Sequence, residues 1–512
     1  MAVVAVAAAL LVSGGSSSDP RTPRALPGGP PPFLGTAVTG SGRLTAAIDG
    51  YGDVVDLRPE GPVAPAAFAV SSARQVAETV PRDTGIVPRV GAGPGPPLPL
   101  WRADWVRQRY APSSNVVVTT ASVDRARVEI VDAVPPPGSA LFRRVRVVAE
   151  RGGPVNLTIG GSGTSAGCRG GHWTAPRRLR IGLVCSPTQP PAARAAPVAR
   201  ALRADHRWLA GATPLGPGAP RWAWLMYRRS LLTLRALTDS RSGAVAAGAR
   251  DGWAYVWPRD AGAVAIALAS AGYRREARRI ARFLTHLDPD AAARYRGDGS
   301  PVGGRAAAGD AAGWIDAAAR AARIPAPPPG PTDWRGRDDY GERGDSGDYL
   351  ANAIADGVPA PRIGALFGAG PFLVRRARDA DSGIDSAVAW AVRPFPRPAL
   401  FPQSRASIRR LLAQRTPYGI QPTAQWPGAD LWTAPTAWTA WSLAALDDRG
   451  SALSLIASLR RAATPAGALP ERVDAVSGVA RSTTPLAWSH AFTALALQEL
   501  WPIRAAGRIP SP

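Results

Sequence analysis

Short runs of alternating apolar and polar residues dominate the first 200 residues of the chain. The runs are rich in Val, Ile and Thr and are bounded by Gly and Pro, a pattern typical of strands in an all-β unit. The clearest of them are 42–48, 115–120, 127–131, 141–149 and 155–159. The pattern predicts a β-sandwich domain over residues 30–205.

The pattern changes near residues 206–220, where Pro and Gly mark a linker. After it, apolar residues recur at spacings of three and four, which indicates amphipathic helices. The expected helices lie at 222–237, 261–271, 274–284, 311–322, 349–355, 384–392, 404–412, 435–446, 452–461 and 487–500. We therefore predict a helical domain over residues 221–505, a toroid of helices whose loops build a site.

Composition agrees with a globular protein of two or three domains. The 512 residues are 46% hydrophobic, and a typical domain has about 150 residues. Four His and two Cys are too few for a zinc or iron–sulfur framework. The longest apolar run, Ala2 to Val12, is shorter than the roughly 20 residues that cross a bilayer. We expect no membrane span.

The net charge of +23 does not indicate a nucleic-acid partner. All 61 residues counted as Lys or Arg are Arg, and they are spread from Arg21 to Arg508. A nucleic-acid-binding protein concentrates its charge in a patch or stripe. We attribute the charge to coding bias and expect no nucleic-acid partner.

Residues 1–25 have the apolar core of a signal peptide but lack its basic beginning. They are either part of an export signal or an unstructured N-terminus. Export is favoured, and a cytoplasmic location is the alternative. In an oxidising compartment Cys168 and Cys185 can form a disulfide, with two separate buried thiols as the alternative.

The first candidate for chemistry is the loop WAYVWPRD at the start of a predicted helix. It places Trp253, Tyr255 and Trp257 beside Arg259 and Asp260. Aromatic faces suit the apolar face of a sugar, and a carboxylate and a guanidinium suit its hydroxyl groups. A buried aromatic cluster with a salt bridge at a helix start is the alternative.

Further loops of the helical half add carboxylates. Residues 298–310 fit a sugar loop or an ordinary turn equally well. Residues 333–345 gather five carboxylates and two aromatics, including Tyr340 and Glu342, and residues 469–490 contain Glu471. Two loop glutamates on one rim of a helical domain fit acid–base hydrolysis of a glycoside, in which one carboxyl protonates the leaving oxygen and the other activates water.

These motifs resemble those of glycoside hydrolase family 15, the glucoamylases, glucodextranases and bacterial trehalases. The resemblance rests on WAYVWPRD (253–260), LPERVD (469–474) and PLAWSH (485–490). It implies a β-sandwich followed by an (α/α)6 barrel that hydrolyses α-glucosidic bonds from non-reducing ends with inversion. It further implies Trp257, Arg259 and Asp260 as ligands of the terminal glucose and Glu471 as general base.

The resemblance also implies a general acid in a loop of the type Asp-Leu-Trp-Glu-Glu. The stretch DYGER, 339–343, keeps the Asp and the first Glu, so Glu342 is the expected acid. The literal Asp430-Leu431-Trp432 is a decoy in this interpretation, because Thr433 follows where the Glu should be.

Several positions depart from the family pattern. Trp253 stands where Tyr is common, Arg343 replaces the second Glu, and Arg472 follows the base where Gln is common. The expected sugar ligands are completed by the aromatic residues Trp253, Tyr255, Tyr340 and Trp488.

Two functions stay open. The first is an exo-acting α-glucoside hydrolase on an α-glucan or a small α-glucoside, which needs no cofactor and no metal. The second is a catalytically weakened carbohydrate-binding relative of the same fold. The preferred linkage and the oligomeric state do not follow from the sequence, because specificity depends on loop shape beyond the first sugar.

Overall fold

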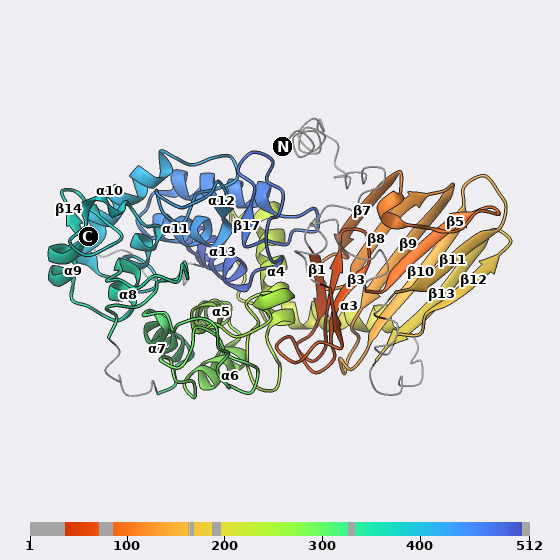
Figure 1. The fold of residues 1–512 in the computed structure, drawn as a ribbon, viewed down its shortest axis with the longest axis horizontal. Helices are drawn as coiled ribbons and strands as arrows, with labels where there is room; N and C mark the ends of the chain where they lie inside the picture. The colour runs from red at the N-terminus through yellow and green to blue at the C-terminus, as the bar shows by residue number, and fades with distance from the viewer. Residues whose placement is uncertain are drawn as a thin grey trace.

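The computed structural model describes residues 36–70, 85–161, 163, 168–186, 196–325 and 333–503. The signal-like segment 1–25 lies outside these residues. Strands fill the N-terminal part and helices the C-terminal part, with helix α4 between them (Figure 1). This order is the one expected from the change of pattern near residue 210.

Three antiparallel sheets make up the N-terminal part. The first contains, in order, β1 (Thr36–Gly40), β2 (Thr45–Asp49), β3 (Val54–Arg58) and β4 (Phe68–Ala69). The second contains β13 (Arg178–Cys185), β10 (Leu141–Ala149), β9 (Ala126–Ala133), β8 (Val117–Val123) and β7 (Trp105–Tyr110). The third contains β12 (Gly171–Ala175), β11 (Val155–Gly160), β5 (Val87–Ala92) and β6 (Leu98–Pro99).

Alternation along these strands builds the core. In β10 every second residue, beginning with Leu141, is buried. Buried residues from each of the three sheets form one hydrophobic cluster, which contains Cys168 and Cys185. These two cysteines are joined in a disulfide, so the pairing considered from the sequence is confirmed.

The first sheet is buried on both faces. Val38, Ala47 and Val55 belong to the core of the helical part, whereas Ala46 and Val54 belong to the core of the sheets. Successive side chains of a strand point to opposite faces. One sheet therefore contributes to two cores and joins the two parts of the molecule.

The helical part contains ten described α-helices after residue 220. They are α4 (Arg221–Leu237), α5 (Pro258–Ser270), α6 (Arg274–Leu284), α7 (Ala311–Ala322), α8 (Leu350–Ala355), α9 (Ala360–Phe367), α10 (Phe401–Leu412), α11 (Thr433–Ala445), α12 (Arg449–Ala462) and α13 (Ala487–Leu500). Among the described residues no helix is long and apolar enough to cross a membrane.

Three helical elements differ from the sequence prediction, and one of them, α9 (Ala360–Phe367), has no predicted counterpart. The expected helix 384–392 is a 3-10 helix, Ser386–Ala391, and Pro394 and Pro396 stop any extension beyond it. Helix α3 (Pro197–Leu209) also had no counterpart in the prediction. It packs its Ala201 against a small cluster of strand residues, including Val118 and Val131.

Helices α5, α11 and α13 lie in the interior, and nearly all their residues are buried. Small residues allow the close packing: a Cβ at Gly262 of α5 would lie 2.8 Å from the carbonyl oxygen of Trp314 in α7. All three helices begin next to one cavity, because Trp257, Trp432 and Leu486 directly precede them and line it.

Candidate active site

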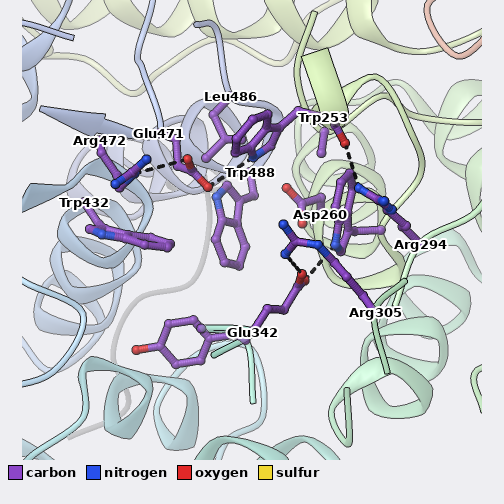
Figure 2. Close-up of a pocket in the computed structure, with 15 residues that line it drawn as sticks. Trp253, Asp260, Arg294, Arg305, Glu342, Trp432, Glu471, Arg472, Leu486 and Trp488 are labelled. Carbon is purple, nitrogen blue, oxygen red and sulfur yellow. Dashed lines mark hydrogen bonds and ion pairs between the residues drawn. The ribbon is translucent and has the colours of Figure 1, made fainter. Parts of the chain in front are cut away.

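The cavity at the beginnings of α5, α11 and α13 has a volume of about 290 Å³ (Figure 2), near the lower end of the roughly 300–1,000 Å³ of ligand pockets. Seven of the nine residues expected from the sequence line it: Trp253, Trp257, Asp260, Tyr340, Glu342, Glu471 and Trp488. Loops far apart in the chain therefore converge on one site.

The other two expected residues lie elsewhere. Tyr255 lines a second cavity, of about 700 Å³, whose walls include Arg58 of β3 and Arg296. Arg259 is 4% exposed and lies behind the lining, with its guanidinium 5.0 Å from the centre of the Trp488 ring. Neither residue lines the candidate active site.

Glu342 lies in a tight turn, in which its own backbone N–H donates a hydrogen bond to the carbonyl of Asp339 at 3.0 Å. Its φ of 46° is in the left-handed region, which costs a non-glycine residue on the order of 1–3 kcal/mol. The carboxylate offsets this cost through its contacts. Oε1 accepts hydrogen bonds from Trp257 Nε1 at 2.7 Å and Arg259 Nη2 at 3.1 Å, and Oε2 pairs with Arg305.

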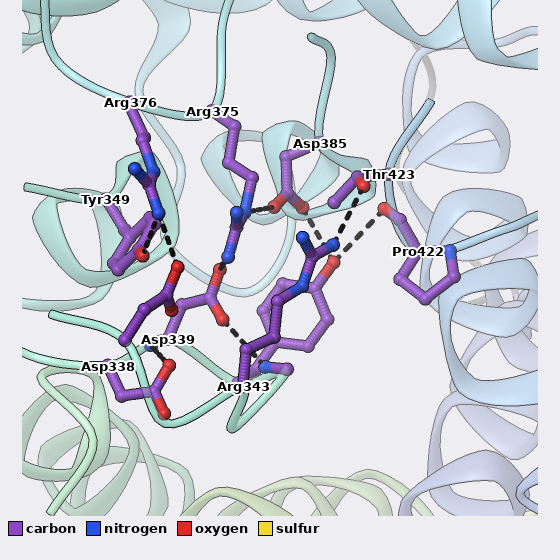
Figure 3. Close-up of polar contacts among 12 residues, drawn as sticks. Asp338, Asp339, Arg343, Tyr349, Arg375, Arg376, Asp385, Pro422 and Thr423 are labelled. Carbon is purple, nitrogen blue, oxygen red and sulfur yellow. Dashed lines mark hydrogen bonds and ion pairs between the residues drawn. The ribbon is translucent and has the colours of Figure 1, made fainter. Parts of the chain in front are cut away.

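A buried network of polar contacts holds this turn in place (Figure 3). Arg375 donates to Asp339 Oδ2 at 2.7 and 3.0 Å, and Asp339 Oδ1 accepts the N–H of Gly341 at 2.9 Å. The Tyr340 hydroxyl donates to Asp385 at 2.8 Å, which turns it away from the cavity. Burial, helped by the charge of Asp339, raises the pKa of Asp385 to about 7.

Glu471 is held from the other side of the site. Its carboxylate accepts hydrogen bonds from Trp253 Nε1 at 3.1 Å and from the Ser482 hydroxyl. Arg472 Nε lies 3.5 Å from the same carboxylate. The backbone N–H of Glu471 bonds to the carbonyl of Thr483 at 2.9 Å, so both the main chain and the side chain of Glu471 are fixed.

Asp260 lies in the wall of the cavity at 4% exposure. Burial raises its pKa to about 8, and the charges of Glu342, Glu471 and Asp310 raise it further while Arg259 opposes them. The carboxyl is therefore protonated near neutral pH and can donate a hydrogen bond. Arg259 itself is paired with Asp310 at 3.2 Å.

The sequence analysis missed part of the lining, including Arg294, Arg305, Trp432 and Leu486. Trp432 belongs to the motif 430–432, which the sequence analysis interprets as a decoy. The two-residue strand β16 (Leu431–Trp432) pairs with β17 (Arg472–Val473) and brings Trp432 opposite Arg472. Because residues 430–432 resemble the acid motif, the sequence analysis did not consider Trp432 as a lining residue.

Two indole N–H groups of the lining are available to a ligand. Trp432 and Trp488 are 8% and 3% exposed, and their Nε1 atoms have no hydrogen-bond partner among the described residues. A buried donor without a partner costs about 1–3 kcal/mol. A ligand rich in oxygen acceptors would remove this cost by accepting a hydrogen bond from each indole N–H. No group of three His, Cys, Asp or Glu suited to a metal occurs in the described ranges.

Comparisons with known proteins find a similar sequence in one segment and a similar fold over most of the chain. A family model, Glycosyl hydrolases family 15, matches residues 222–295, which include Trp253, Trp257 and Asp260. No curated protein matches the chain significantly. Among solved structures, a bacterial glucoamylase complexed with acarbose is similar over 94% of this chain and 97% of its own, with 13% sequence identity and a TM-score of 0.62.

A second solved structure, a glucoamylase from Saccharomycopsis fibuligera, is similar over 54% of this chain and 94% of its own, at 11% identity and a TM-score of 0.44. The bacterial likeness shows a common fold for both the sheet-rich and the helical part. The family match is confined to residues 222–295, the segment that carries the WAYVWPRD motif, and it agrees there with the resemblance seen in the sequence.

Proposed function

We propose that the protein is an inverting, exo-acting hydrolase of α-glucosidic bonds that releases glucose from α-glucans or small α-glucosides. One observation carries the proposal: Glu342 and Glu471, from loops 129 positions apart, line the same cavity. Inverting glycosidases use two carboxyl groups about 6.5–9.5 Å apart, so that a water molecule fits between base and sugar.

In this proposal Glu342 is the general acid and Glu471 the general base. Glu342 gives a proton to the glycosidic oxygen as its bond to the anomeric carbon breaks. Glu471 takes a proton from the water whose oxygen bonds to that carbon from the opposite face, which inverts its configuration. Trp253 and Ser482, which hold the Glu471 carboxylate, orient the base toward the water.

The terminal glucose is assigned to the space among Asp260, Trp432 and Trp488. The protonated Asp260 carboxyl donates to a sugar hydroxyl, and the two indole N–H groups donate to others. The aromatic faces cover the apolar face of the ring. Tyr255 and Arg259 are assigned supporting positions, since Arg259 holds Glu342 and Tyr255 lies beyond the lining.

We assign the helical part, 221–505, as an (α/α)6 barrel that forms the catalytic domain. We assign 30–205 as a β-sandwich domain and 206–220 as the linker. The inward position of α5, α11 and α13 and the common placement of their starts at the cavity support an inner layer of helices. Loops at one end of such a layer are where a site forms.

One observation favours the alternative, a carbohydrate-binding relative with weakened catalysis. Both oxygens of Glu342 face donors, namely Trp257, Arg259 and Arg305, so the acid needs a rearrangement before it can hold and transfer a proton. Glucose release from maltose, maltotriose, trehalose and isomaltose separates the two functions. Proton NMR of the first product settles the stereochemistry: β-glucose supports the proposal, and α-glucose excludes inversion.

A further inference from the structure

Arg294 is a cation of the cavity wall without an acidic partner. No carboxylate lies within 4.0 Å of it among the described residues. Its guanidinium lies 5.1 and 5.7 Å from the ring centres of Tyr255 and Trp257. It makes only a long hydrogen bond, 3.4 Å, to the carbonyl of Gly252, and its buried Nε has no partner in the described part of the chain.

Arg305 lies on the same side of the cavity as Arg294 (Figure 2). Its side chain is 43% exposed, and its ion pair is with Glu342. Arg259, the other cation on Glu342, is 5% exposed at its side chain and is also fixed by Asp310. Of the two arginines on Glu342, Arg305 is therefore the one that can move to a new partner.

The contact of Arg305 with Glu342 indicates which part of the substrate Arg305 would meet. In the proposed function Glu342 protonates the leaving oxygen, so a side chain bound to Glu342 lies beside the leaving group. An anion on that group would attract Arg305 and so release Glu342 Oε2. Arginine suits this role because its planar fork of donors matches a carboxylate or phosphate with two parallel hydrogen bonds.

We propose that the site is selective for α-glucosides whose leaving group carries a carboxylate or phosphate, bound by Arg294 and Arg305. This inference rests on the proposed function, because it assumes Glu342 as the acid. Neutral sugars supply hydroxyl acceptors but no charge to balance Arg294. Asp260 does not balance it either, since its carboxyl is protonated near neutral pH, with a pKa raised to about 8 by burial.

Matched substrates test the selectivity in the full-length protein. Maltobionate and maltitol are both α-1,4-glucosides. The leaving group of maltobionate carries a carboxylate where that of maltitol carries an alcohol. Trehalose 6-phosphate and trehalose form the corresponding phosphate pair. We expect kcat/KM to be about 10- to 100-fold higher for at least one anionic member, the range of a charge-assisted hydrogen-bonded contact. The pair with the larger ratio identifies the anion as carboxylate or phosphate.

Variants test the residues. Arg294→Gln should reduce the anionic-to-neutral ratio about tenfold or more, and Arg294→Lys, which keeps the charge and loses the fork, should give an intermediate ratio. Arg296→Gln is the matched control. Arg296 is exposed on the same loop, lines the other cavity and bonds to Ser300 and Pro301, so its replacement should leave the ratio unchanged.

The outcomes separate the inference from the proposed function. Glucose release from neutral substrates with both ratios near one overturns the inference and keeps the function. If no compound releases glucose, calorimetry with the same four compounds decides: tighter binding of an anionic member overturns only the function. Equal binding, or none, overturns both. An unchanged ratio in Arg294→Gln also overturns the inference.

Discussion

His490 Nε2 accepts a hydrogen bond from the backbone N–H of Leu469 at 3.0 Å, two residues before Glu471. The imidazole proton is therefore on Nδ1, which lies 3.1 Å from the Ser230 hydroxyl. Burial lowers the pKa of His490 to about 3, so the ring stays neutral. A neutral histidine in the first turn of α13 thus fixes the loop that carries the proposed base.

This relationship predicts a pH dependence of stability. The unfolded chain binds a proton at His490 below a pKa of about 6.5, whereas the folded chain does so only near 3. The free energy of unfolding should therefore fall as pH drops below about 6.5. His490→Gln, which keeps an acceptor, should lose this contribution to the slope. Guanidinium unfolding at pH 4.5 and 7.5 measures the change in the free energy of unfolding between the two pH values. An equal change in the original protein and in His490→Gln would contradict the prediction.

Replacement of the proposed base should separate folding from turnover. Glu471→Gln keeps the size of the side chain and an oxygen acceptor for Trp253. We expect turnover to fall about 10²–10⁴-fold, the usual contribution of a positioned base, with an unchanged circular dichroism spectrum. Asp430→Asn is the control, because Asp430 pairs with Arg472 and does not line the cavity. A comparable loss in the control would argue against a special role of Glu471.

The protonated state of Asp260 should appear in the pH profile of kcat/KM. Above its pKa of about 8 the carboxyl loses the proton that it donates to the sugar. Activity should decline through this pH. Asp260→Asn, a permanent donor, should remove the decline. Asp260→Ala should lower specific activity about 10- to 100-fold, because buried partners are left unpaired at about 1–3 kcal/mol each. Full activity in Asp260→Ala would remove the residue from the site.

Arg375 should act on catalysis through the turn of Glu342. Arg375→Gln removes the fork that holds Asp339 and lets the turn shift. A displacement of about 1 Å can lower the rate up to 100-fold, so we expect kcat to fall more than KM changes. Arg376→Gln is the control, since Arg376 pairs with Asp345 at the surface, where both side chains are 38% exposed. An equal fall of kcat in the Arg376→Gln control would contradict a specific role of Arg375 in positioning this turn.

The sequence predicted the order of strands and helices well because both depend on local periodicity. Strand β10 matches the expected 141–149, and helix α6 matches 274–284. It also identified seven of the fifteen lining residues, because these seven belong to recognisable motifs. Arg294 and Arg305 could not be found this way, because they lie in long loops whose course is set by tertiary contacts.

Tyr255 lies between two residues that line the candidate active site, but the side chains of one irregular loop can face different cavities. Trp253 and Trp257 line one cavity and Tyr255 the other. No spacing in the sequence says which face is the catalytic one.

The first sheet, with its alternate residues in two cores, has a consequence for engineering. A fragment that starts near residue 220 would lack the strands whose side chains Val38, Ala47 and Val55 complete the helical core. It would present that apolar face to water and should aggregate or stay partly unfolded. We therefore expect that the helical part is not a transferable module, and that an excised version would need polar substitutions over the exposed face before it could fold alone.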